Sequence, residues 1–149
     1  PDGIGPAHSR DTKSYPFGDM MPLFDDTDLV FSYSRRQALE DGVLVDVSEM
    51  AREAAFRYPV AVTRAVWDGV VTPDHESRAM GQSEAGRLWD VLTVLRVAIR
   101  RSKGPAQTLE FHVLVAERQT RRRTVTLKAV CGPDDDGSPC ITVMLPQED

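Results

Sequence analysis

One amphipathic helix is the feature that most constrains how this chain folds. Apolar residues recur at helical spacing through "SEAGRLWDVLTVLRVAIRRS", residues 83–102: Leu88, Leu92, Leu95 and Ile99, widened by Trp89, Val91 and Ala98. We assign Arg87, Asp90, Thr93, Arg96, Arg100 and Arg101 to the opposite, solvated side. Ser83 is a natural N-cap, and Gly104-Pro105 ends the helix. An apolar stripe of this length has to be buried, so we expect the central core helix here.

The last forty residues alternate between apolar and polar positions, which is the period of a β-strand. Three strands are predicted, at about 108–117, 123–131 and 140–146, and short turns join them into an antiparallel meander. Their apolar rows fall on one face, which we expect to pack against helix 83–102. The fold class is therefore α+β, with one long core helix packed on a C-terminal three-stranded antiparallel meander.

Shorter elements precede this core. Residues 29–31 suit a short strand, and Ser34 stands three residues before Gln37, the spacing of a capping box. That spacing predicts a brief helix from Arg35, which Gly42 ends. Residues 43–47 are rich in valine and predict a second strand.

Two more helices are expected before the core helix. Asp46 or Ser48 can cap the first, which Pro59 ends, and Thr63 can begin the second, which runs to about Val71. "TPDHES" then breaks the pattern. Residues 1–28 hold many prolines and glycines and predict an irregular N-terminal arm, whereas residues 29–149 form a single α+β domain.

Composition narrows the class of protein. Hydrophobic residues make up 41% and charged residues 28% of 149 residues, as in a soluble globular domain. No apolar run is long enough to span a membrane, and no export pattern opens the chain. The net charge of −5 argues against general nucleic-acid binding. Two cysteines fit a reducing compartment, so we expect a cytoplasmic protein.

The sequence contains no pattern that indicates a metal site, a cofactor site or a disulfide. His8, His75 and His112 are scattered without ligand spacing, so we predict no metal site and no cofactor. If Cys131 shares the face of the core row, strand alternation points Cys140 to the opposite face. That register disfavours a bridge between the two cysteines.

Catalytic motifs are absent. Whether the protein is an enzyme stays open, and the sequence favours a protein without catalytic activity. One group of residues could still bind a phosphate-bearing ligand such as a nucleotide: Tyr33, Arg35, Arg36, Asp46 and Trp67. Arginines suit bidentate phosphate contacts, and Asp46 could serve as a base. The alternative is that the aromatic residues pack and the arginines are solvated, as in ordinary scaffold.

The two turns of the meander carry opposite charges. The first holds Arg118, Arg121, Arg122 and Arg123, and the second holds Asp134, Asp135 and Asp136. Adjacent turns of a meander lie at opposite ends, so the sheet is predicted to be electrically polarised. One interpretation is solubility and protection of sheet edges. The other is a partner-binding surface that attracts an acidic or phosphate-bearing partner at one end and a basic one at the other.

Three segments resemble a family of uncharacterised bacterial proteins, often found on plasmids and phages and catalogued as a domain of unknown function. They are "FSYSRRQALEDGVLVDVSEMAREAAFRYPVAVTRAVW", "GRLWDVLTVLRVAIRR" and "LKAVCGPDDDGSPCITVMLPQED". The resemblance implies no activity, cofactor or catalytic residue. The mobile-element setting favours a non-enzymatic interaction protein that binds a host or defence-system protein, including a counter-defence (anti-CRISPR-like) or host-modulating inhibitor. The phosphate-ligand hypothesis and a weaker one, nucleic-acid binding through the 118–123 arginine turn, remain as alternatives.

Overall fold

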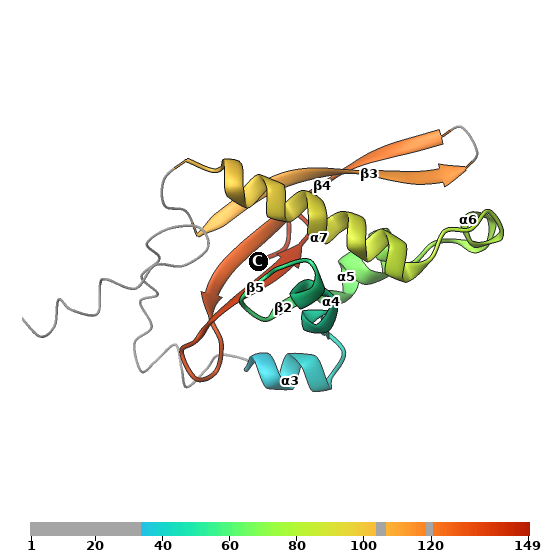
Figure 1. The fold of residues 1–149 in the computed structure, drawn as a ribbon. Helices are drawn as coiled ribbons and strands as arrows, with labels where there is room; N and C mark the ends of the chain where they lie inside the picture. The colour runs from blue at the N-terminus through green and yellow to red at the C-terminus, as the bar shows by residue number, and fades with distance from the viewer. Residues whose placement is uncertain (1–33, 104–106, 119–120) are drawn as a thin grey trace, which may run out of the picture.

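One five-stranded sheet organises the chain in the computed structural model, which describes residues 34–103, 107–118 and 121–149 (Figure 1). The elements follow in the order α3 (Arg35–Glu40), β1 (Leu44–Asp46), α4 (Ser48–Glu53), β2 (Val60–Thr63), α5 (Arg64–Val66), η2 (Trp67–Val71), α6 (His75–Ala79), α7 (Glu84–Arg101), β3 (Thr108–Arg118), β4 (Arg121–Pro133) and β5 (Pro139–Met144). The fold is α+β. The predicted N-terminal arm and the strand at 29–31 lie outside the described residues.

The sheet is larger than the predicted meander. Its order is β1-β2-β5-β4-β3, with β2 and β5 parallel and every other neighbouring pair antiparallel. The expected arrangement, one helix on three strands, is therefore wrong in its extent, because β2 extends the sheet beside β5. All four residues of β2 are buried. A strand buried on both faces shows no alternation, and "VAVT" falls between two stretches that had been assigned to helices.

Helix α7 begins where its cap predicts, since the Ser83 hydroxyl accepts a hydrogen bond from the Gly86 amide at 3.0 Å. Four residues of its apolar stripe, Leu88, Val91, Leu92 and Leu95, are buried against one face of the sheet together with residues of α4, α5 and η2, and Ala98 and Ile99 are partly buried there. Trp89, which was predicted to widen this apolar face, is instead 42% exposed. Strands β2, β3, β4 and β5 contribute buried residues, including Phe111, Leu127 and Val143, and β1 contributes the partly buried Val45. One core thus joins the long helix to both halves of the sheet.

The predicted start of α3 is confirmed. Ser34 and Gln37 form a reciprocal capping box, and Gly42 follows the helix with a φ of 80°. Helix α4 begins near the expected position, but the predicted cap by Asp46 or Ser48 is wrong, because the N-cap is Val47 and makes no side-chain cap bond. The Asp46 carboxylate instead accepts from the Ser48 amide at 3.0 Å. The helix ends at Glu53, well before Pro59, because Ala55 adopts a φ of 73°. The "TPDHES" stretch, expected to be irregular, holds the single-turn helix α6, capped by Asp74.

The two faces of strand β5 are covered by different elements. On β5, Ile141 and Val143 face the core, whereas Cys140 and Met144 are buried on the other face. Helix α3 lies on that other face, since the Arg35 guanidinium at its start donates to the Thr142 hydroxyl. Cys131 pairs in register with Ile141 and faces the core, so the predicted opposite orientations of the two cysteines are confirmed. No disulfide joins them, and burial raises the pKa of the Cys140 thiol.

None of the helices in the described part of the chain is long and apolar enough to cross a lipid bilayer.

Candidate functional site

Three of the residues predicted to bind a phosphate-bearing ligand, Arg35, Asp46 and Trp67, have side chains engaged within the fold. The Arg35 guanidinium donates to the Thr142 hydroxyl at 2.6 Å and to the Ile141 carbonyl at 3.0 Å. The Asp46 carboxylate accepts from Ser48, and Trp67 packs partly buried against the core. Tyr33 lies outside the described residues. Within the described ranges, no hydrogen bond or ion pair joins Arg35 or Arg36 to Asp46.

The aspartate turn also contacts this region. The Asp135 carboxylate accepts from the Arg35 amide through one oxygen and from the Arg36 amide through the other, both at 2.9 Å. These are the first two amides of α3, which have no partner inside the helix. Asp135 therefore attaches α3 to the β4–β5 turn, a contact one hundred residues apart in sequence that local patterns could not reveal.

The other two aspartates interact with each other. Asp134 accepts from the amides of Asp136 and Ser138 at 3.0 and 3.2 Å, and Asp136 accepts from the Ser138 amide at 2.9 Å. Burial and the hydrogen bond to Asp136 raise the pKa of Asp134, whereas the same hydrogen bond lowers the pKa of Asp136 to about 2. The two carboxyls form a pair in which Asp134 holds its proton more tightly.

The arginine turn lies at the opposite end of the sheet, as Figure 1 shows from the positions of the β3–β4 and β4–β5 connections. Arg123 forms an ion pair with Glu117 at 2.5 Å and donates to the Gly69 carbonyl at 3.2 Å. Arg121 and Arg122 are exposed. The backbone of Arg118 belongs to β3, while its side chain is outside the described set. Charges of opposite sign thus occupy the two ends.

Strand β3 lies at one edge of the sheet, and no strand in the part of the chain that the structure describes pairs with its outer main-chain edge. The Cys131 amide donates to the Gln107 carbonyl, which makes these opposite residues a hydrogen-bonded pair. Such pairs alternate along an antiparallel ladder, so the amides and carbonyls of Glu110, His112 and Leu114 point away from β4. No residue of the described segments bonds to these groups. The same alternation turns the Ala116 carbonyl outward, where it accepts from Arg87.

A pocket of about 200 Å³ lies between this edge and helix α7. One wall is the β3 stretch 113–116, and the other comes from α7 and the segments before it. The lining polar side chains are Gln82, Arg87, Asp90 and Arg122. Leu114 lies at its margin with 59% of its surface exposed. The pocket is therefore a groove that combines unpaired main-chain groups, an apolar side chain and charge.

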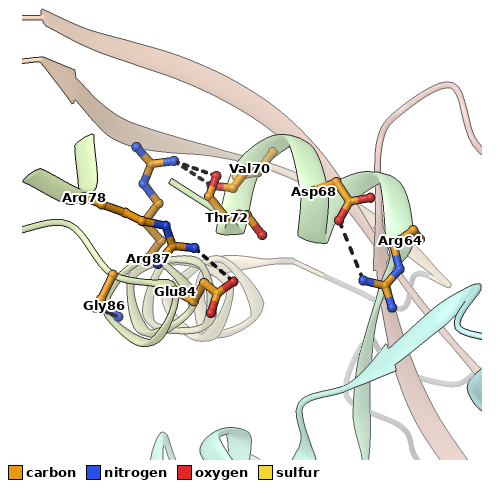
Figure 2. A network of polar contacts seen from close by, with 9 residues as sticks. Arg64, Asp68, Val70, Thr72, Arg78, Glu84, Gly86 and Arg87 are labelled. Atoms are coloured by element: carbon orange, nitrogen blue, oxygen red, sulfur yellow. Dashed lines mark hydrogen bonds and ion pairs between the residues drawn. The ribbon is translucent and has the colours of Figure 1, made fainter. Parts of the chain in front are cut away.

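Arg87 supports one end of this groove. Only 6% of the residue is exposed, and its guanidinium donates to the carbonyls of Val70 and Thr72 at 3.3 and 3.5 Å (Figure 2). It also donates to the Ala116 carbonyl at 2.8 Å. Its Nε is buried and finds no acceptor among the residues that the structure describes. Burial lowers its pKa, and the nearby charge of Arg123 lowers it further. The side chain ties the end of η2 to the edge of β3 and leaves a buried positive charge beside the groove.

The sequence prediction placed Arg87 on the solvated side of the helix, and this is wrong. Arg87 stands four residues before Val91 and eight before Leu95, both of which are buried. It therefore belongs to the apolar stripe, and a charged residue within that stripe was the available signal of a buried role.

The edge itself left no local signal, since strand order depends on contacts distant in sequence. Elsewhere in the described ranges, no cluster of three metal-ligand side chains occurs.

A family model described as a family of unknown function (DUF6573) matches residues 20–149. The chain belongs to this family. Its match includes α3, the whole sheet and the groove between β3 and α7, so these are features of the DUF6573 portion of the chain. Comparisons with curated proteins and with solved structures give no match. The family description carries no activity, and the function has to be argued from the site.

Proposed function

We propose that this DUF6573 protein acts by binding another protein through the edge of β3, and that it catalyses no reaction. The observation that carries the proposal is the run of main-chain groups beside the exposed Leu114 that have no partner among the residues the structure describes. Free strand edges in folded proteins are normally short, covered or charged, because they pair readily with other chains. This edge has a groove beside it, which suits recognition.

The mobile-element setting suggested by the sequence resemblance makes a host or defence-system protein the expected partner, and inhibition by binding the expected mode of action. The internal contacts of Arg35 and Asp46 support binding over catalysis, since the groups that suited a reaction are engaged in holding the fold. A phosphate-bearing ligand at those residues gains no support from their geometry.

Site-specific photo-crosslinking in a bacterial lysate tests the proposal. A benzophenone amino acid replaces Leu114 at the groove, or Arg52 on the exposed side of α4 as the matched control. A partner protein captured from Leu114 and absent from Arg52 is the expected result. Capture of the same background proteins from both positions would reject protein binding through this edge.

One observation favours a second candidate, nucleic-acid binding. Arg121, Arg122 and Arg123 are all exposed at the end of the β3–β4 hairpin. Binding through them should weaken steeply with salt, because phosphate contacts release counterions. Replacing all three with Ala should then abolish a gel-mobility shift with a mixed DNA and RNA probe; an unchanged shift would reject this candidate.

A further inference from the structure

We propose that the groove binds an extended segment of the partner, which pairs with β3 as an additional strand and places an aspartate or glutamate beside Arg122. This inference rests on the proposed function and specifies what occupies the site. It has three independent supports: the direction of the main-chain groups, the way the edge is closed at one end, and the charge of the lining.

The main chain offers a complete pairing surface. Glu110, His112 and Leu114 direct three amides and three carbonyls outward at alternate positions. The stretch 108–114 is long enough for about 20 Å of added strand at ~3.3 Å per residue. Added strands gain affinity from such main-chain bonds and specificity from pockets for alternate side chains. The groove supplies such a pocket at one end of this stretch, since its β3 wall includes Val113 and Leu114.

The structure protects the edge only beyond this stretch. A register shift interrupts the β3–β4 ladder between Ala116 and Arg118, and the Ala116 and Glu117 carbonyls are bonded to Arg87 and Ser77. An incoming strand is therefore stopped near Leu114, which sets its register. From 108 to 114, Glu110 is the only acidic or basic residue apart from His112. At the opposite edge, β1 has only three residues.

Charge indicates an acidic residue in the partner segment. Two arginines, Arg87 and Arg122, line the groove against a single carboxylate, Asp90. Within the described segments, Arg87 is paired with carbonyls and with no carboxylate, so its charge is not neutralised by direct contact. Arg122 is exposed and can form the ion pair. Partial burial in the groove strengthens such a pair relative to one in open solvent.

Selection from a phage-displayed library of random linear peptides tests the inference. Selected peptides are synthesised, and their affinity is measured by fluorescence anisotropy. We expect peptides with alternating apolar residues and an acidic residue. Leu114→Pro removes an outward amide but no ladder bond, so it should weaken binding by about 10-fold or more relative to Leu114→Thr. Arg122→Glu should weaken it similarly, whereas Arg121→Glu, outside the groove lining, should have little effect.

The alternatives give different results. Equal peptide affinity of Leu114→Pro and Leu114→Thr would overturn strand addition. So would an empty selection accompanied by specific crosslinking from Leu114, which would leave the proposed function standing; an empty selection without crosslinking would reject both. Sedimentation of the wild type as a dimer that Leu114→Pro dissociates would show that a second copy occupies the edge. If Leu114→Pro fails to fold, peptide-induced shifts of the Glu110 and His112 amides in wild-type NMR spectra decide, and unshifted amides overturn the inference.

Discussion

Ala55 holds a backbone conformation that L-amino acids rarely adopt, with a φ of 73° at the end of α4. The Phe56 amide bonds to the Ala51 carbonyl and the Ala55 amide to the Arg52 carbonyl, which is the Schellman pattern. Glycine normally occupies this position. Ala55→Gly should relieve about 1–2 kcal/mol of strain, offset by about 0.4–1 kcal/mol of unfolded-state entropy. We expect a net stabilisation of about 0.5–1 kcal/mol in urea unfolding.

A matched control separates relief of strain at Ala55 from the general effect of replacing alanine with glycine. Ala85 is exposed inside the first turn of α7, so Ala85→Gly should destabilise by about 0.5–1 kcal/mol. Destabilisation by both changes would mean that Ala55 is not strained.

Arg87 is the residue whose removal should cost the fold most among its charged side chains. Arg87→Met keeps much of the buried volume but leaves the Val70, Thr72 and Ala116 carbonyls without their donor. Loss of these bonds, offset by removal of a desolvated charge, should lower the free energy of unfolding by about 2–4 kcal/mol. Arg78→Met is the control, because Arg78 is half exposed and its pair with Glu84 contributes about 1 kcal/mol or less. Equal stability of the two variants in chemical denaturation would contradict a clamping role for Arg87.

At the scale of elements, the sequence predicts those that carry their own local signal. The cap at Ser34 and the stripe of α7 were enough to locate two helices, and alternation located β3, β4 and β5. Strand β2 was missed because burial on both faces removes alternation, and α6 because one turn is too short for a period. The predicted end of α4 was wrong because Ala55 occupies the position after the helix where glycine, the usual sequence signal of a helix end, is normally found.

The β4–β5 turn should titrate in two separated steps. Asp136, with a pKa near 2, stabilises the fold above its ordinary pKa of 3.8, and this contribution is lost as pH falls from about 4 towards 2. The raised pKa of Asp134 acts oppositely, since its stabilisation is complete below 3.8 and is lost as pH rises through the folded pKa. Carboxyl carbon NMR should resolve the two steps. Asp134→Ala should return the pKa of Asp136 towards 3.8. Coincident titration of both wild-type carboxyls near 3.8 would contradict the pairing.

At the scale of the molecule, the candidate site comes from the order of the strands. Sequence alone identified the two charged turns, and Arg122 among them lines the groove. The predicted meander already placed the strand at 108–117 at one edge. The sequence could not show that β2 joins the sheet beside β5, so that the sheet extends on the side away from β3. Nor could it place α7 beside the β3 edge. Both follow from contacts between residues far apart in the chain, and together they form the surface that we propose for another chain.

This arrangement predicts an alternating pattern of hydrogen exchange along β3. The amides of Leu109, Phe111 and Val113 face β4 and should exchange roughly 100-fold or more slowly than the outward amides of Glu110, His112 and Leu114. Residue-resolved exchange measured by NMR checks this in the free protein. A bound strand would slow the three outward amides and leave their neighbours unchanged, because only the outward groups gain partners. Uniform protection along β3 in the free protein would mean that the edge is already paired, and the groove would then not be available for a partner.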